Sequence, residues 1–179
     1  MSAATHAVLP AHLQADCTAC VGLCCVVAPF DAVQGFGFDK PAHTPCPHLC
    51  ADFRCGIHET LEARGFRGCV VFDCQGAGQR VTRRYEGRNW RDAPEVAQEM
   101  YEAYTVMRGL HETMALLHTA SVHVADARLA AMLETVEALC ERAPDRVDAE
   151  RARREAMALL AEPGVREALR GLRQARAER

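Results

Sequence analysis

Residues 17–25 read Cys-Thr-Ala-Cys-Val-Gly-Leu-Cys-Cys and hold four of the ten cysteines of the chain. The first two form a CxxC turn, which brings two sulfurs to one side of the backbone, as a tetrahedral metal or the iron of a cluster requires. Adjacent side chains point in different directions, so Cys24 and Cys25 can serve two metals, or one of them can bridge two. This stretch therefore predicts a fold organised around thiolate ligands.

A second group of cysteines follows further along the chain. The segment Cys46-Pro47-His48-Leu49-Cys50 is short enough to wrap one site, and Cys69-x4-Cys74 can close the same site or another. With Cys55, the nine N-terminal cysteines exceed one four-ligand site and nearly match two such sites with one spare. His48 and His58 lie among them and can substitute for a sulfur. The predicted metal ligands are Cys17, Cys20, Cys24, Cys25, Cys46, Cys50, Cys55, Cys69 and Cys74.

Such a density of cysteine points to metal or redox chemistry rather than a disulfide framework if the chain stays in a reducing compartment. Met1–Asp16 lacks the basic start and apolar stretch of a secretory signal. No apolar run approaches the roughly 18–20 residues that span a bilayer. We therefore expect a cytoplasmic protein without a membrane segment. The tenth cysteine, Cys140, falls on the inward side of an expected helix and is interpreted as a core residue.

Residues 1–92 and 93–179 differ in composition, and we expect two domains with this boundary. The first is rich in Cys, Gly, Pro, Phe and His, and turn signals recur throughout it. It offers little apolar surface, so it is expected to need a metal in order to fold. One short helix is expected over Ile57–Arg64, and short strands are expected over Val70–Phe72 and Arg80–Tyr85.

The second half begins at Asp92-Ala93-Pro94-Glu95, a helix start with Asp as N-cap and Pro in the first turn. Further helices are expected over Ala125–Arg142, from an Asp145 cap through Leu160, and from Pro163 onward. Their short connections predict an antiparallel bundle. The fold class is therefore mainly α, with a small irregular metal-stapled Cys-rich module followed by an antiparallel helical bundle. Apolar residues at spacings of four and three mark the first helix: Val96, Met100, Ala103, Met107, Leu110, Met114 and Leu117.

The cysteine pattern continues as Cys46-x-x-Leu49, then Cys55-Gly56-Ile57-His58, then Cys69 with Phe72 behind it. With the CxxC-x3-CC start, this resembles the YkgJ-type cysteine-cluster family, described as a zinc- or iron-chelating domain, over about residues 17–75. The sequence departs from the family pattern at its first spacing, which is one residue longer, at His58 in place of Tyr, at Arg64-Gly65 in place of Arg-Pro, and at the extra Cys50. The resemblance implies ligand roles for Cys17, Cys20, Cys24, Cys25, Cys46, Cys55, Cys69 and Cys74.

The stretch from Phe66 through Gln79 also resembles the cysteine-rich leader of some bacterial pentapeptide-repeat proteins, although this chain has no such repeats. The expected function is that of a metal-binding protein that serves electron transfer, sensing or metal handling. The expected cofactor is an iron–sulfur cluster or zinc. Cys46-Pro47 is typical of iron–sulfur sites, whereas CxxC turns joined by short loops are typical of zinc.

Two alternatives belong to other classes. One is a metal-dependent enzyme with the cluster at its active site, and the other is a thiol oxidoreductase that uses Cys17 and Cys20. The sequence leaves open whether the chain is an enzyme, and it identifies no catalytic residue.

Metal ions are the expected partners, and the helical half offers a surface to an unknown protein partner. The formal net charge of −3 gives no bulk electrostatic reason to expect nucleic acid. His111 and His118 share one helix face and, with His123, suggest either an accessory metal site or ordinary histidines at the core edge. Lys40 is the only lysine, which we interpret as a compositional bias.

Overall fold

The computed structural model describes residues 8–177, without the side chains of residues 171–177. The start of Met1–Asp16, the stretch for which no secretory signal is expected, lies outside the described residues. The described residues form two compact units. The cysteine unit runs from Ala15 to Arg108. The helical unit combines residues 8–14 with residues 109–177.

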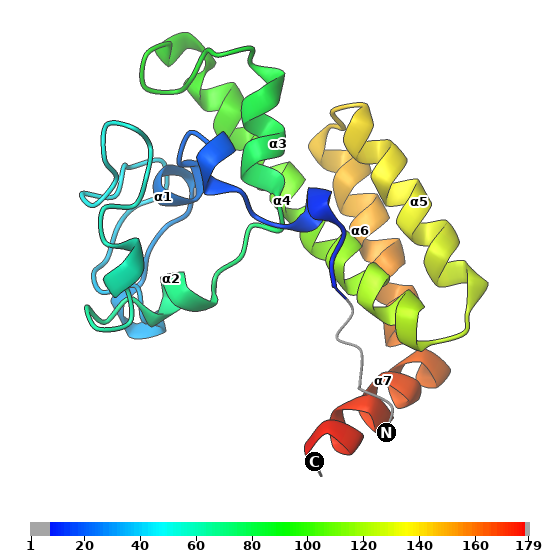
Figure 1. The fold of residues 1–179 in the computed structure, drawn as a ribbon. Coiled ribbons are helices and arrows are strands. Elements are labelled where there is room, and N and C mark those ends of the chain that lie inside the picture. The colour runs from blue at the N-terminus through cyan, green and yellow to red at the C-terminus, as the bar shows by residue number, and fades with distance from the viewer. Residues whose placement is uncertain (1–7, 178–179) are drawn as a thin grey trace. The chain divides into compact units, whose positions relative to one another are not determined.

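The fold is mainly α, as expected. Between residues 8 and 177 there is no β-strand, and pairing is limited to the isolated bridges Phe30–Lys40 and Leu49–Cys55. None of the helices in this part of the chain combines the length and apolar character needed to cross a membrane. The helices, labelled in Figure 1, are α1 (Leu23–Val27), α2 (Arg67–Val71), α3 (Ala77–Arg84), α4 (Pro94–His123), α5 (Ala127–Glu141), α6 (Arg146–Ala161) and α7 (Pro163–Ala177), with 3₁₀ helices η1 (Ala11–Leu13), η2 (Cys17–Ala19), η3 (Ala32–Gln34) and η4 (His58–Thr60).

The prediction of two strands in the cysteine unit is wrong. Most of Val70–Phe72 belongs to the end of α2, and its valines are exposed, so the apolar run does not reflect burial. The segment Arg80–Tyr85 lies almost entirely in α3. Ala77, Val81 and Tyr85 are all buried and lie four residues apart, which is helical spacing. The helix expected over Ile57–Arg64 is reduced to the short η4.

Helix α4 begins at Pro94, as predicted, but the turn before it is organised by Asn89 rather than Asp92. The Asn89 side-chain oxygen accepts hydrogen bonds from the N–H groups of Arg91 at 2.9 Å and Asp92 at 3.0 Å. Asn89 Nδ2 in turn donates to Asp92 Oδ2 at 2.8 Å. The predicted cap carboxylate is thus bound to the preceding turn. The periodic positions of α4 are buried except Ala103, which is half-buried.

The helical unit is built from successive helices that pack on their neighbours. Helices α5 and α6 lie side by side, and α6 also contacts α7 (Figure 1). Asp145 caps α6 as predicted, because its carboxylate accepts the Asp148 N–H at 2.8 Å. Asp126 caps α5 in the same way through the Arg128 N–H at 3.0 Å. The Arg128 guanidinium also pairs with Glu162 at 2.7 Å, which ties the start of α5 to the end of α6.

Candidate metal centre

The CxxC pair of the cysteine unit lies at the 3₁₀ helix η2. Asp16 fixes the start of this helix, because its carboxylate accepts the Thr18 N–H at 2.8 Å and the Thr18 hydroxyl at 2.6 Å. Cys17 is the first residue of η2, and Cys20 follows its end with extended backbone. Cys17 is exposed, whereas Cys20 is half-buried. The local turn therefore presents both thiols from one short segment.

Gly22 then turns the chain into α1, which carries the adjacent pair Cys24 and Cys25. Its φ of +69° is left-handed, and an added Cβ would lie 2.8 Å from Leu49 Cδ1. Only glycine satisfies both conditions without strain. The sulfurs of Cys24 and Cys25 are 3.8 Å apart, so the expectation that they point in different directions is wrong for this short helix.

Helix α3 brings Cys74 next to Cys20. Gly78 of α3 is buried, and a Cβ at this position would lie 2.7 Å from Cys20 Sγ and 3.8 Å from Cys74 Sγ. The same packing is held by Gln79, whose side-chain oxygen accepts the Asp16 N–H at 3.0 Å. Two thiols separated by more than fifty positions in the sequence are thus both packed against Gly78.

Backbone N–H groups surround these two sulfurs. Burial raises the pKa of Cys20 to about 11, although N–H groups of Leu23 and Gly22 donate hydrogen bonds to its sulfur and oppose the shift. Burial likewise raises the pKa of Cys74, against hydrogen bonds from the N–H groups of Gly78 and Gly76. In the metal-free chain these thiols therefore keep their protons at neutral pH. The N–H donors are aimed where thiolate charge would develop, which suits metal-bound sulfur.

Cys17 and Cys24 complete this first group. Although Cys17 as a whole residue is exposed, desolvation of its sulfur raises its pKa, and the Cys24 and Cys74 thiols raise the pKa further. The pKa of Cys24 is raised well above its usual value by its hydrogen bond with Cys25 and by burial. An ionised thiol raises the pKa of another thiol only when the two lie close together. The first group is Cys17, Cys20, Cys24 and Cys74.

A second group of thiols lies against the small apolar core of Ile57, Leu61 and Phe66. Cys55 and Cys69 pack on this core and are half-buried. Burial raises the pKa of Cys69 to about 11, and the thiols of Cys24, Cys46 and Cys55 add to the shift. The second group is therefore Cys46, Cys55 and Cys69, again with Cys24 as a neighbour.

Cys46 also connects the second group to α1. It is 7% exposed, and its N–H donates to the Cys25 carbonyl at 2.9 Å. Burial raises the pKa of its thiol, and Cys55 contributes in the same direction. The backbone hydrogen bond fixes Cys46 directly beside the Cys24–Cys25 step.

Lys40 places a positive charge beside this junction, and sequence reasoning missed it. Its side chain is 4% exposed, and its ammonium lies 4.7 Å from the centre of the Phe30 ring. Burial lowers the pKa of Lys40, while the Cys46 and Cys25 thiols oppose this shift. Its Nζ donates to four backbone carbonyls: Val26 at 3.3 Å, Ala28 at 2.6 Å, Pro41 at 3.1 Å and Thr44 at 2.8 Å.

Two cysteines lie apart from both groups: Cys50, which was predicted to be a metal ligand, and Cys140, which was interpreted as a core residue. Cys50 is exposed, and its sulfur lies 2.8 Å from the point where a Cβ of Gly56 would be, with the His48 carbonyl at 3.9 Å. Cys140 is 2% exposed in α5, which confirms it as a core residue of the helical unit.

The sulfurs do not already form a coordination sphere. Among residues 8–177, no group of three or more His, Cys, Asp or Glu side chains is arranged to hold a metal ion. The three histidines of the suggested accessory site, His111, His118 and His123, therefore form no such group. His111 is fully buried and His123 is exposed, so these side chains do not share one environment.

Tyr104 is a second residue that sequence reasoning missed. It lies on the buried face of α4 between Met100 and Met107 and is 1% exposed. Burial raises the pKa of its hydroxyl well above the usual value, and the thiols of Cys24 and Cys74 add to the shift. Within the described residues, its hydroxyl has no hydrogen-bond partner. A buried hydroxyl next to thiols is suited to donate to a thiolate or sulfide once a metal is bound.

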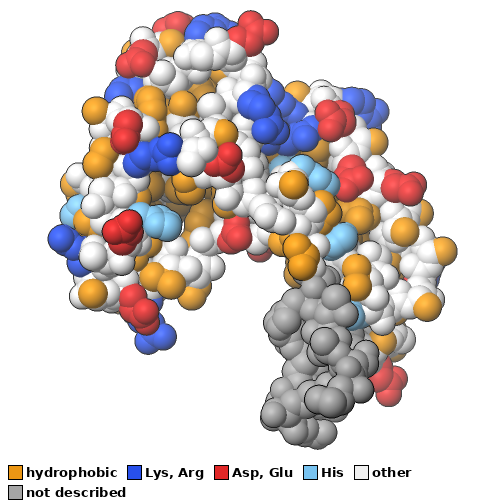
Figure 2. All heavy atoms as spheres, in the orientation of Figure 1, with side chains coloured by type: hydrophobic (Ala, Val, Ile, Leu, Met, Phe, Trp, Pro, Cys, Tyr) orange, Lys and Arg blue, Asp and Glu red, His pale blue; other side chains and the backbone are white. Residues whose placement is uncertain are grey.

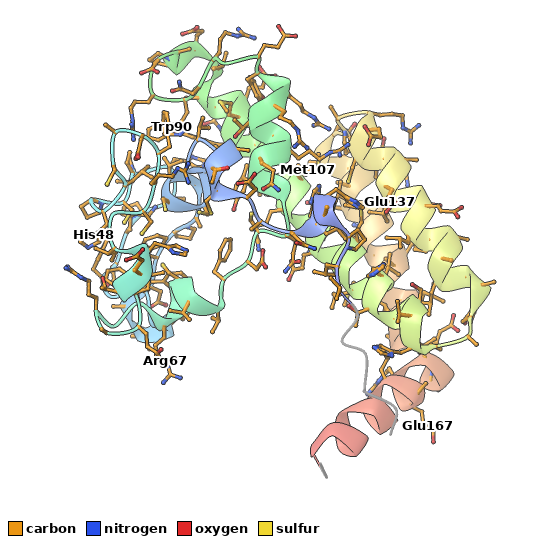
Figure 3. All side chains as sticks on the ribbon, in the orientation of Figure 1. His48, Arg67, Trp90, Met107, Glu137 and Glu167 are labelled. Carbon is orange, nitrogen blue, oxygen red and sulfur yellow. The ribbon has the colours of Figure 1, made fainter. Side chains whose placement is uncertain are left out.

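The single tryptophan connects the turn that precedes α4 to the first loop of the cysteine unit. Trp90 Nε1 donates to the Val21 carbonyl at 2.7 Å, directly after Cys20 (Figure 3). The Arg91 guanidinium donates to the carbonyls of Ala51 at 2.7 Å and Cys50 at 3.1 Å. The loops that carry the thiols are thus fastened to the turn that precedes α4. On the face shown in Figure 2, acidic and basic side chains are interspersed over the described residues.

The comparisons with known proteins give one relative without an assigned function. The chain is similar to an uncharacterized Bacillus subtilis protein, YybG, with 41% identity over 140 residues, which is 75% of this chain. The chain spans half the length of that relative. No protein-family model matches the chain, and no solved structure matches it.

Proposed function

We propose that the cysteine unit binds metal through cysteine thiolates and holds iron in an iron–sulfur cluster, or zinc. Metal ions are the partners that this function requires. Electron transfer, sensing and metal handling follow for iron–sulfur, and a structural staple follows for zinc.

The observation that carries the proposal is the position of Cys24 among the other thiols. Its sulfur is 3.8 Å from that of Cys25. Thiols from four separate segments of the chain interact electrostatically with it. A folded protein gathers so many partly buried thiols only rarely for packing alone, because small apolar side chains fill a core as well. The interacting residues are Cys17, Cys20, Cys25, Cys46, Cys69 and Cys74.

The donor set also fits the chemistry of thiolate-bound metal. Soft thiolates select zinc and iron–sulfur clusters over magnesium or calcium. The N–H donors around Cys20 and Cys74 supply outer hydrogen bonds of the kind that tune such sites, and the Tyr104 hydroxyl is available to supply another once metal is bound. Since the sulfurs are not yet gathered around one point, metal binding is expected to draw them together and order the loops that carry them.

The thiol oxidoreductase alternative is less consistent with the geometry. A nucleophilic CxxC cysteine needs a lowered pKa, usually from a helix N-terminus or a nearby cation. Burial raises the pKa of both Cys17 and Cys20 instead. For a metal-dependent enzyme, the described residues give no specific observation in favour.

The proposal includes three further parts. The first is membership of the YkgJ-type cysteine-cluster family, on the residues quoted for that resemblance. The second is the detailed architecture, a metal-stapled Cys-rich module followed by an antiparallel helical bundle. The third is a reducing, cytoplasmic location, because reduced thiols persist there.

The test is to purify the full chain without oxygen and measure iron, acid-labile sulfide, zinc and the visible spectrum. Iron with sulfide and a brown colour would identify a cluster, and stoichiometric zinc in a colourless protein would identify a zinc site. Protein that binds neither metal, even after anaerobic reconstitution with each, would overturn the proposal.

A further inference from the structure

We propose that the thiols form two adjacent metal sites that meet at the Cys24–Cys25 step, and that Cys50 is a ligand of neither. This inference rests on the proposed function and adds the ligand division. One site is supported by Cys17, Cys20 and Cys74, the other by Cys46, Cys55 and Cys69. Cys24 and Cys25 stand between them and complete both.

The first site is defined by the packing of α3 on η2. Because residue 78 is glycine, Cys20 Sγ and Cys74 Sγ can lie 2.7 Å and 3.8 Å from the position that a Cβ on this residue would occupy. Cys17 lies in η2 itself, which α3 contacts. The Thr82 hydroxyl of α3 accepts the Val21 N–H at 3.2 Å and holds the loop after Cys20 against the helix. The three thiols are therefore positioned by one packing contact.

The second site is defined by a different part of the cysteine unit. Cys55 and Cys69 lie on the apolar core of Ile57, Leu61 and Phe66, which is separate from the η2–α3 contact. Cys46 approaches from the α1 side through its hydrogen bond to the Cys25 carbonyl. No element is shared between this core and the packing that holds Cys17, Cys20 and Cys74.

The Cys24–Cys25 step joins the two positions. Its two sulfurs lie 3.8 Å apart in α1, close enough for each to bind a different metal or for one to bridge two. Cys24 interacts electrostatically with members of both groups, Cys17 and Cys74 on one side and Cys69 on the other. Two four-thiolate sites need eight sulfurs in total. Three of the first site, three of the second site and the adjacent pair supply this number: Cys17, Cys20, Cys74, Cys46, Cys55, Cys69, Cys24 and Cys25.

Cys50 is excluded by its surroundings. Its sulfur is exposed and lies against Gly56 and the His48 carbonyl rather than against another thiol. Its own carbonyl accepts a hydrogen bond from the Arg91 guanidinium at 3.1 Å, which holds this part of the loop to the turn before α4. Cys50→Ser is therefore the matched control for the ligand variants.

The experiment is an anaerobic Co²⁺ titration of the reduced, metal-free full chain, followed through the thiolate-to-cobalt charge-transfer and d–d absorption bands. Each bound thiol releases its proton as Co²⁺ binds. We expect saturation at about two equivalents of Co²⁺, since each site takes four thiolates. The absence of any charge-transfer band would contradict the proposed function itself. Saturation at one equivalent would leave thiolate binding intact and overturn the division into two sites.

The ligand division is tested by the same titration on single variants. Cys74→Ser and Cys55→Ser should each lower the stoichiometry by about one equivalent, because each removes a ligand from one site only. Cys24→Ser should also lower the stoichiometry by about one equivalent, because the eight thiols fill two four-thiolate sites with none to spare. Cys50→Ser should titrate as the wild type. Loss of all binding in both Cys74→Ser and Cys55→Ser, with helical circular dichroism retained, would indicate a single site. A lowered stoichiometry in Cys50→Ser would overturn its exclusion.

Discussion

Helix α3 approaches Cys20 closely because residue 78 is glycine. The Cys20 sulfur lies 2.7 Å from the position that a Cβ on residue 78 would occupy, and the Cys74 sulfur lies 3.8 Å from the same point. Real Cβ atoms essentially never lie within 3.0 Å of another heavy atom. Both side chains are half-buried, which restricts how far the sulfurs can move aside.

Gly78→Ala is therefore expected to separate α3 from the first group of thiols. Overpacking of this kind costs about 1–3 kcal/mol, partly offset by about 1 kcal/mol from the better helix propensity of alanine. We expect a lower melting temperature and loss of Co²⁺ binding at the site of Cys20 and Cys74. Thermal unfolding and Co²⁺ titration measure the two effects.

Gly164→Ala provides the control, since a Cβ there would meet nothing within 4 Å and the residue lies in the first turn of α7. This variant should be neutral or more stable by up to about 1 kcal/mol. Unchanged melting and unchanged metal binding in Gly78→Ala would show that the contact with Cys20 is not needed.

Lys40→Met is expected to destabilise the cysteine unit. Methionine fills a similar volume but leaves the carbonyls that the ammonium satisfies without their donor. Loss of donors from a charged group to buried acceptors costs about 2–4 kcal/mol. The variant also removes the positive charge that faces Cys25 and Cys46. We therefore expect a lower free energy of unfolding in urea and weaker metal binding by the second group of thiols.

Lys40→Arg separates charge from geometry, because arginine keeps the positive charge but not the compact ammonium. If the four hydrogen bonds from the ammonium to backbone carbonyls contribute most of the stability, Lys40→Arg should be nearly as destabilising as Lys40→Met. Equal stability of wild type and Lys40→Met would contradict the structural role given to the four carbonyl contacts.

Tyr104→Phe is expected to have opposite effects on the two forms of the protein. In the metal-free form the buried hydroxyl has no partner within the described residues, so its removal should be neutral or stabilising by about 1 kcal/mol. In the metal-bound form we expect the hydroxyl to donate to a ligand sulfur, so its removal should weaken binding at the first group of thiols. Urea unfolding with and without Co²⁺ separates the two effects.

Tyr101→Phe is the matched control on the same helix, since burial is the cause of the raised pKa of Tyr101 and no thiol contributes. It should not change Co²⁺ affinity. If Tyr104→Phe destabilised both forms equally, the hydroxyl would have a structural role and not a role toward the metal.

Spacing rules predicted the helical unit well because its helices depend on local periodicity. The Asp145 cap and the buried positions Leu110, Met114 and Leu117 follow from the sequence alone. Short elements of the cysteine unit were harder to predict. Helix α3 has only eight residues, of which Ala77, Gly78, Gln79 and Val81 are buried, so its apolar pattern is too short to separate a helix from a strand.

The ligand candidates were predictable, whereas their grouping was not. Cys69 and Cys74 are five positions apart but belong to different groups, because α2 ends at Val71 and Phe72 has extended backbone, so Cys74 lies beyond α2. Motif spacing carries no information about such a change of chain direction. Lys40 and Tyr104 were missed for a related reason, since their burial depends on contacts between distant segments.

The metal-free, reduced protein is expected to lose stability as the pH rises from about 9 to about 11. Burial raises the pKa of Cys20 and of Cys69 to about 11 in the folded state. In this window the unfolded chain has released protons that the folded chain still holds, so the free energy of unfolding falls with pH. Lys40 acts in the opposite sense, because burial lowers its pKa, but it is one group against several thiols. Urea unfolding at each pH, with reductant present, measures the slope.

Cys20→Ser should make this slope shallower, because it removes one of the thiols whose pKa is raised. Bound metal should remove the thiol contribution to this slope, since metal-bound thiolates carry no proton to lose. The contribution of Tyr85, Tyr101 and Tyr104 should remain, because burial raises the pKa of each of these hydroxyls as well. Stability that rises between pH 9 and 11 in the metal-free protein would contradict the burial of these thiols.

Metal removal is expected to change the cysteine unit far more than the helical unit. Trp90 is the only tryptophan, and its indole N–H is bound to the Val21 carbonyl beside Cys20, so its fluorescence reports on the first loop of thiols. Chelation should shift its emission to longer wavelength as this loop loosens and water reaches the ring. The helices after Gly109 have their own core, including Leu117, Leu129 and Val136, so most of the helical circular dichroism should remain. A collapse of the helical signal together with the fluorescence change would mean that the metal supports both units, and an unchanged emission spectrum would mean that the loop of Cys20 does not depend on metal.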